Sequence, residues 1–182
     1  DGVQISTKQQ YYIKFHKPAG YITAVDDPTH PVVMDLLPPE FKKMGVFPVG
    51  RLDKDTEGLL LLTNDGIWAH SIINGHKHVP KVYYVEFNGK LTKDGLERIE
   101  TGIVLGDGTQ CKPAKIDVLS DCSLHITIEE GKYHQVKRMI GAAGGEVTYL
   151  KRLSIGYITL DGIEAINTYS EIADQDVVDF KK

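Results

Sequence analysis

The sequence has little of what would mark a membrane protein, a disulfide scaffold or a metalloprotein. Its longest apolar runs, such as GLLLLT, are far shorter than the ~20 residues that a membrane helix needs. It holds two cysteines, Cys111 and Cys122, with no CxxC pair and no spacing typical of a zinc site. We therefore expect a soluble protein of a reducing, cytoplasmic setting, with no metal and no contact with a membrane.

Excess positive charge is also missing from the sequence as a whole. The net charge is −4 over 182 residues, and the sequence pI is near 6.0. Proteins that bind nucleic acid over their whole surface are usually basic, so this balance argues against that class. The distribution is uneven, however, because residues 131–153 hold five basic side chains against the single acid Glu146. The sequence thus predicts a local basic patch on an acidic protein.

Segments of alternating apolar and polar residues predict several strands. The first lies within residues 10–17, and a Pro-Gly turn leads from it to a second apolar stretch at 21–24, so we expect a hairpin there. Around residues 50–58, VFPVG and LLLLT indicate a strand, a polar corner and a second strand. The other predicted strands are KVYYVEF, AKIDVLS, LHITIEE and EVTYLKRLSIGYITL.

Three helices are predicted from capping residues and helical spacing. Asn64 and Asp65 can cap a helix over DGIWAHSIING, and a capped helix over TKDGLERIETGI is expected to start at Thr92. KYHQVKRMIGAAGG places Tyr133 and Val136 on the apolar face of a third helix. Because the strands follow no regular βαβ order, we predict an α+β fold in one domain, with a mixed, mainly antiparallel sheet and flanking helices.

The stretch GRLDKDTEGLLLLTNDG, residues 50–66, places the acids Asp53 and Asp55 directly before an apolar strand. A solvated polar turn is one interpretation. A calcium loop fits poorly, because acids do not continue at alternate positions. A glycoside hydrolase would use Asp53 and Asp55 as its acid pair, but no aromatic sugar platform accompanies them. The other interpretation is a carboxylate at a strand end, kept ionised by a basic residue for nucleophilic or general-base chemistry.

Four segments resemble the motifs of one enzyme family. GRLDKDTEGLLLLTNDG resembles the catalytic motif of the pseudouridine synthases, and EGKYHQVKRM resembles their C-terminal basic motif. With HKPAGYI near the start and KVYYV in the middle, the order and spacing are similar to those of the RsuA type, which modifies ribosomal RNA. The resemblance implies the pseudouridine synthase fold with an RNA-binding cleft across its middle, and an isomerase that needs no cofactor.

The resemblance also implies roles for three residues. Asp53 matches the essential aspartate, which acts on the target nucleotide as a nucleophile at the sugar or base, or as a base at the sugar. Tyr83 matches the tyrosine that stacks on the target base and assists removal of the proton from C5. Lys137 matches the basic residue that pairs with the aspartate, and Arg138 is the alternative. Without the motifs, Tyr83 also fits a core position and Lys137 a solvated helix face.

Basic residues near these positions are predicted to contact RNA. The candidates are Arg51, Lys17, His134, Arg138 and Lys132. Arg51 directly precedes the aspartate and is placed to hold a phosphate, although an ion pair with Asp55 is the alternative. For Lys17, which flanks a turn, simple exposure to solvent is the alternative.

RsuA-type enzymes carry a small basic S4 RNA-binding domain ahead of the catalytic one. We expect residues 1–10 to be the remnant of a linker from a missing S4-like domain, and residues 11–182 to be the catalytic domain. The segment EGKYHQVKRM followed by IGYITLDG favours small-subunit (16S) ribosomal RNA, or an assembly intermediate of the ribosome, as the substrate. We expect the enzyme to be a monomer. Large-subunit (23S) ribosomal RNA as substrate and a catalytically silent RNA-binding protein are the alternatives.

Overall fold

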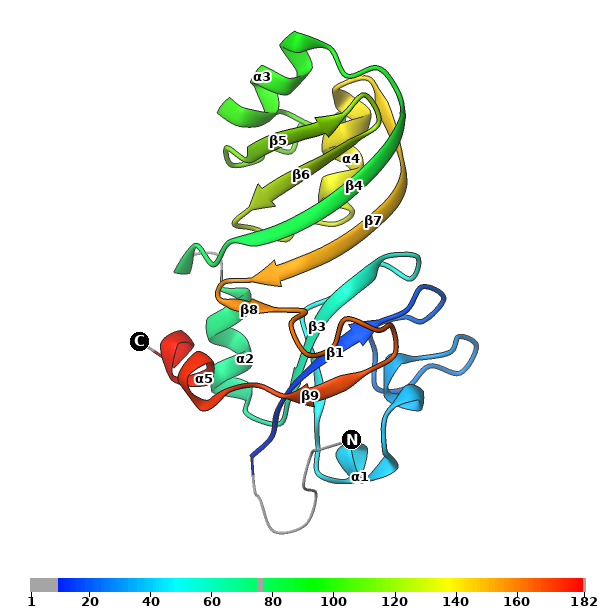
Figure 1. The fold of residues 1–182 in the computed structure, drawn as a ribbon, viewed down its shortest axis with the longest axis vertical. Coiled ribbons are helices and arrows are strands. Elements are labelled where there is room, and N and C mark those ends of the chain that lie inside the picture. The colour runs from blue at the N-terminus through cyan, green and yellow to red at the C-terminus, as the bar shows by residue number, and fades with distance from the viewer. Residues whose placement is uncertain (1–9, 75–76, 182) are drawn as a thin grey trace. The chain divides into compact units, whose positions relative to one another are not determined.

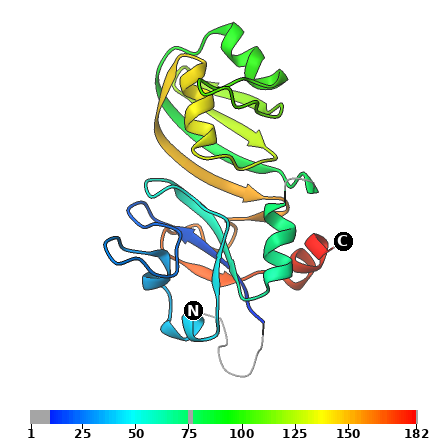
Figure 2. The same cartoon turned by 180° about the vertical axis from the view of Figure 1, so that it is seen from behind.

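The computed structural model describes residues 10–74 and 77–181. The chain folds into two units, the first formed by the segments up to Lys77 and from Tyr157 onward, the second by the continuous segment 78–156. Figure 1 shows the elements of each unit, and Figure 2 shows the same elements from behind. The predicted linker remnant at residues 1–10 falls almost wholly outside the described residues and stays a prediction.

Strands and helices are distributed over both units. The first unit contains β1 (Tyr12–Lys17), η1 (a 3₁₀ helix, Val33–Leu36), α1 (Pro39–Lys43), β2 (Phe47–Val49), β3 (Glu57–Thr63), α2 (Gly66–Ile73), β8 (Ile158–Thr159), β9 (Tyr169–Glu171) and α5 (Asp174–Lys181). The second contains β4 (Lys81–Gly89), α3 (Lys93–Thr101), β5 (Lys115–Ser120), β6 (Ser123–Ile128), α4 (Gln135–Ala142) and β7 (Gly145–Ile155). No helix in the described parts of the chain is long and apolar enough to cross a membrane.

Strand β3 forms the core of the first unit. Its four consecutive leucines, residues 59–62, are all 0% exposed, as expected of a strand that is covered on both faces. β1 pairs with β3 antiparallel over its whole length, from Tyr12 opposite Thr63 to Lys17 opposite Gly58. β2 pairs antiparallel with the end of β3. The strand, polar corner and strand predicted around residues 50–58 are therefore confirmed.

The hairpin predicted near the start of the chain is wrong. In the segment 21–24, Ile22 makes an isolated β-bridge, and its partner is Val32 in a parallel arrangement. β1 has two edges, and β3 and β9 pair with them, since Phe15 lies opposite Leu60 on one side and Tyr169 on the other. A second strand at 21–24 therefore has no free edge of β1 on which to pair.

The second unit is a four-stranded antiparallel sheet in the order β5-β6-β4-β7. Helix α4 packs on β7 and α3 on β5, and both views show α4 against one face of this sheet (Figures 1 and 2). α4 buries Val136, Met139 and Ile140, the apolar stripe that its sequence predicts. Antiparallel ladders with helices beside them confirm the predicted fold class.

Two of the three predicted helices have the N-terminal capping residue that the sequence predicts. The Asp65 side chain accepts a hydrogen bond from the backbone N–H of Trp68 at the start of α2, and Thr92 accepts one from Gly95 at the start of α3. Each bond satisfies a backbone donor that has no partner within the helix.

Helix α4 begins later than predicted, because His134 stands before it in a left-handed conformation, with φ 48° and ψ 36°. The helix therefore begins at Gln135, and the carbonyl oxygen of His134 accepts its first hydrogen bond, from the backbone N–H of Arg138 at 2.9 Å. Tyr133 lies outside the helix and is 76% exposed, so its predicted place on the apolar helix face is wrong.

Candidate active site

Asp53 lies in the loop that joins β2 to β3 in the first unit. Gly50 and Gly58 stand near its two ends with φ of 73° and 115°, values that favour glycine over any residue with a side chain. Within the loop, the backbone N–H of Thr56 donates to the Asp53 carbonyl oxygen at 3.0 Å and closes a turn. Leu52 and Thr56 are buried, whereas the Asp53 side chain is half-buried. The neighbours of Asp53 thus fix the backbone that carries its carboxylate.

Lys17, the last residue of β1, supports this loop from inside the first unit. Its side chain is 0% exposed, and Nζ donates to the carbonyl oxygen of Thr56 at 2.7 Å. Nζ also lies 3.2 Å from the carbonyl oxygens of Asp53 and Lys54, and 3.1 Å from that of Pro18. A buried charge is tolerated where such acceptors replace water. The predicted RNA contact of Lys17 is wrong, because its ammonium faces backbone carbonyls in the interior rather than solvent.

Residues that follow Lys17 hold the same loop. The backbone N–H of Gly20 donates to the carbonyl oxygen of Lys54 at 2.8 Å. The Thr23 hydroxyl exchanges hydrogen bonds of 3.3 Å with the backbone N–H and carbonyl of Leu52. HKPAGYI and GRLDKDT, which are about 30 residues apart in the chain, therefore form one local structure around Asp53.

Tyr83 lies in the second unit, on β4, and is 8% exposed. It stands opposite Arg152 of β7, where the pairing shifts by one residue so that Leu153 is passed over. Arg152 is 4% exposed, and its Nη1 lies 3.5 Å from the Tyr83 hydroxyl, a long hydrogen bond. β-Bulges of this kind are common beside active sites, where they redirect a side chain. Arg152 was not predicted as a site residue, and its place two residues after buried Leu150 on β7 is the signal in the sequence that could have indicated its burial.

Lys81 is two residues before Tyr83 on β4, so both side chains extend from the same face of the strand. Burial lowers the pKa of the Lys81 ammonium from 10.5 to about 8, and the positive charge of Arg152 is the second cause. The carboxylates of Glu129 and Glu130 act in the opposite direction and are outweighed. Tyr83 and Arg152 are buried in this sheet, and Lys81 is half-buried near enough to feel the charge of Arg152.

The lowered pKa of Lys81 predicts a pH-dependent contribution to stability. Between pH 8 and pH 10.5 the unfolded chain binds more protons at this residue than the folded chain, so stability rises with pH across that window. Relative to Lys81→Met, the wild type should gain on the order of 1 kcal/mol in the free energy of unfolding, after allowance for solvent screening. Urea unfolding of both proteins at pH 7, 8, 9 and 10 measures this gain. A difference that stays constant would contradict it.

Two cations of the basic segment 132–138 form ion pairs with acids of the same unit. Arg138 Nη2 lies 2.7 Å from Asp107 Oδ2, and Lys132 Nζ lies 3.4 Å from Glu130 Oε1. Hydrogen bonds from Thr109, with a smaller contribution from Arg138, lower the pKa of Asp107 to about 2, so it stays ionised.

Asp53 and Arg51 belong to the first unit, whereas Tyr83, Lys137 and the basic segment 132–138 belong to the second. Arg51 is exposed, and Lys137 is half-buried on α4. The pairing of Asp53 with Lys137 stays a prediction, as do the RNA contacts of Arg51 and of the basic segment.

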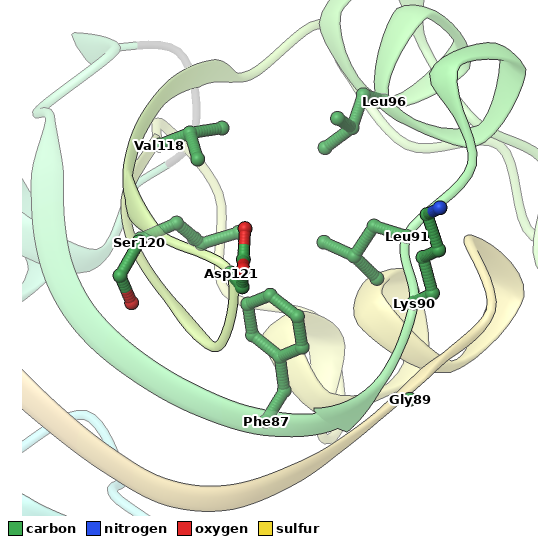
Figure 3. Close-up of a pocket in the computed structure, with 9 residues that line it drawn as sticks. Phe87, Gly89, Lys90, Leu91, Leu96, Val118, Ser120 and Asp121 are labelled. Atoms are coloured by element: carbon green, nitrogen blue, oxygen red, sulfur yellow. The ribbon is translucent and has the colours of Figure 1, made fainter.

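A cavity of about 440 Å³ lies in the second unit. Its lining consists of Phe87, Gly89, Lys90, Leu91, Leu96, Val118, Ser120, Asp121 and Leu124. Figure 3 shows Leu91, Leu96 and Val118 around a common space. The predicted site residues are not on this lining, so the cavity is separate from them. Within residues 10–74 and 77–181, no three His, Cys, Asp or Glu side chains are grouped as a metal site requires.

Comparisons with known proteins identify the family of the chain. The family model described as RNA pseudouridylate synthase matches residues 11–142. The chain is 42% identical over 180 residues to the uncharacterized RNA pseudouridine synthase YtzG of Bacillus subtilis, covering 97% of this chain and 75% of that protein. It is 38% identical over 169 residues to ribosomal small subunit pseudouridine synthase A of Escherichia coli, covering 91% and 72%.

Solved structures also match this chain. A crystal structure of a pseudouridylate synthase superposes with a TM-score of 0.87 at 34% identity, over 94% of this chain and 74% of that one. An H/ACA ribonucleoprotein bound to a substrate RNA superposes with a TM-score of 0.58 at 17% identity, over 83% and 49%, which shows a likeness of fold alone. The chain belongs to the RNA pseudouridine synthase family, and it is an enzyme that isomerises uridine in RNA. The pseudouridine synthase fold expected from the motifs is confirmed.

Proposed function

We propose that this protein converts one uridine of small-subunit (16S) ribosomal RNA to pseudouridine, with Asp53 as the catalytic carboxylate. The identity of 38% with the Escherichia coli small-subunit enzyme, over 91% of the chain, supports the choice of RNA. The support for Asp53 is local, because Lys17 Nζ and the backbone N–H of Thr56 both donate to its carbonyl oxygen, while its side chain is half-buried.

The reaction needs a carboxylate and requires no change of oxidation state. The bond between N1 of uracil and C1′ of the ribose breaks, the base turns, and C5 bonds to C1′. C5 then loses its proton and N1 gains one, so substrate and product are isomers. Asp53 acts on the nucleotide as a nucleophile or as a base, and Lys137 is the cation that pairs with this carboxylate.

The target nucleotide has to leave its stack before Asp53 can reach the bond between sugar and base. An aromatic ring gives an unstacked base a surface on which to lie, and Tyr83 is the candidate for that contact. Arg152 would act as a positioning residue, because its Nη1 reaches the Tyr83 hydroxyl and its own side chain is buried in the sheet. Arg51 would hold a neighbouring phosphate.

The substrate assignment is tested with unmodified RNA. The protein is incubated with transcripts of 16S and 23S ribosomal RNA and with partly assembled small subunits, and pseudouridine is mapped by mass spectrometry. We expect one new pseudouridine in 16S RNA, either in the free transcript or in the assembly intermediate. Modification of 23S RNA alone would contradict the choice of substrate, and no pseudouridine in any of them would contradict the proposed function.

Lys137 is expected to matter more for turnover than Arg138. The motif resemblance assigns Lys137 as the partner of Asp53, and the ion pair of Arg138 with Asp107 already offsets the charge of Arg138. A cation that stabilises developing charge at the reacting centre contributes directly to the rate, so Lys137→Met should lower kcat about 10-fold or more. Arg138→Met should change kcat less and weaken RNA binding. Single-turnover rates of both variants decide the assignment, and a larger loss of kcat in Arg138→Met would reverse it.

A further inference from the structure

A side chain that sequence periodicity places in the core is instead among the most exposed of the aromatic ones. Tyr133 is 76% exposed, and its ring stacks on the ring of His134 with a centroid distance of 3.9 Å and an angle of 19° between planes. Large apolar rings in that position gain little from folding, because they stay in water. The ring pair therefore has another explanation than core packing.

The backbone at this point adopts an uncommon conformation and is well held. His134 is one of three non-glycine residues with positive φ among those the structure describes, and such strain persists where the surroundings impose it. Buried Gln135 accepts a hydrogen bond from the backbone N–H of Lys132 at 2.9 Å and donates to Glu130 at 2.8 Å. The ring pair is thus presented on an ordered turn.

Positive charge surrounds the ring pair on the same turn. Arg138 Nη1 donates to the carbonyl oxygen of Tyr133 at 3.1 Å, which fixes the guanidinium beside it. Lys132 directly precedes Tyr133 and is exposed. The nearby acids Asp107 and Glu130 each pair with one of these cations, and residues 131–145 hold no acid. Aromatic rings combined with cations are the usual means of binding single-stranded nucleic acid.

We propose that the stacked rings of Tyr133 and His134 bind an unpaired base of the RNA substrate other than the uridine that reacts. The exposed face of Tyr133 would stack on the base, while Lys132 and Arg138 contact the flanking phosphates. The inference rests on the proposed function, because it assigns a second contact to the same RNA. It also accounts for an exposed aromatic residue within the basic motif.

Two variants of Tyr133 and one control test this site. Tyr133→Ala removes the ring, whereas Tyr133→Phe keeps a stacking surface and loses the hydroxyl. Tyr157→Ala removes a tyrosine of the same exposure, 79%, that lies outside the basic segment. The Kd for a protein-free 16S transcript and the single-turnover rate at saturating RNA are measured for each protein, with melting temperature as the check of folding.

Tyr133→Ala should raise Kd about 10-fold, in line with the loss of one stacked base. Its rate at saturating RNA and its melting temperature should stay near those of the wild type. Tyr133→Phe and Tyr157→Ala should bind within about 2-fold of the wild type. An unchanged Kd in Tyr133→Ala, in a preparation whose wild type forms pseudouridine, overturns this inference and leaves the proposed function standing. Equal weakening by Tyr157→Ala overturns it as well.

Discussion

Asp53→Asn should abolish nearly all pseudouridine formation while the protein stays folded. The amide is close in size to the carboxylate but is a poor nucleophile and a poor base at neutral pH, so chemistry that depends on the carboxylate stops. Loss of general-base catalysis alone costs about 10²–10⁴-fold in rate. We therefore expect a loss of about 10³-fold or more in kcat, measured by single-turnover assays on the RNA that the wild type modifies.

Asp55→Asn provides the matched control for this prediction. Asp55 is exposed, lies two residues further along the same loop and has the same chemistry. If charge in the loop were all that mattered, both variants would lose activity alike. We expect Asp55→Asn to stay within a few-fold of the wild type, and both variants to keep its melting temperature. Full activity of Asp53→Asn would disprove the assignment of the catalytic carboxylate.

Lys17→Met should lower both stability and turnover, although Lys17 contacts no RNA in our interpretation. Without its ammonium, buried carbonyl groups of the Asp53 loop lose their donor, and each buried polar group left unsatisfied costs about 1–3 kcal/mol. We expect the free energy of unfolding to fall by about 2–4 kcal/mol. A displaced loop also carries Asp53 with it, and a shift of about 1 Å at a reacting group can cost 10²-fold in rate.

Lys54→Met is the control for Lys17→Met, because Lys54 is an exposed lysine on the same loop. It removes an equal charge without removing the buried donor, so its stability and kcat should match those of the wild type. Urea unfolding gives the stability, and rates at a temperature where every variant is folded give kcat. If Lys17→Met kept the wild-type free energy of unfolding, the supporting role of Lys17 would be wrong.

Features that depend on neighbouring residues in the chain were predictable from the sequence. The Asp65 and Thr92 caps are local hydrogen bonds within one helical turn, and a short polar residue before an apolar run is enough to predict them. The corner at 50–58 also has a local signal, since Gly50 and Gly58 bracket it with positive φ.

Features that depend on distant partners could not be predicted in the same way. A Pro-Gly turn after β1 suggests a hairpin, but β3 and β9 pair with both edges of β1. Lys17 looks like a surface lysine until carbonyl groups from residues 53–56 converge on it. Tyr133 fits a helical spacing, yet the left-handed backbone of His134 ends that spacing before the helix begins. In each case a tertiary contact or a single backbone angle overrides the local pattern.

The pairing of β1 with β9 has a consequence for the order of events during synthesis. The first unit is closed by residues near the end of the chain, because β9 pairs with β1 and the Trp68 indole donates to the carbonyl oxygen of Val177 at 3.1 Å. The second unit is continuous in sequence and can fold as soon as residue 156 has left the ribosome. We expect β1 to stay without its outer partner until β9 emerges, so that a nascent chain cut before residue 169 holds the Asp53 loop on an unfinished sheet.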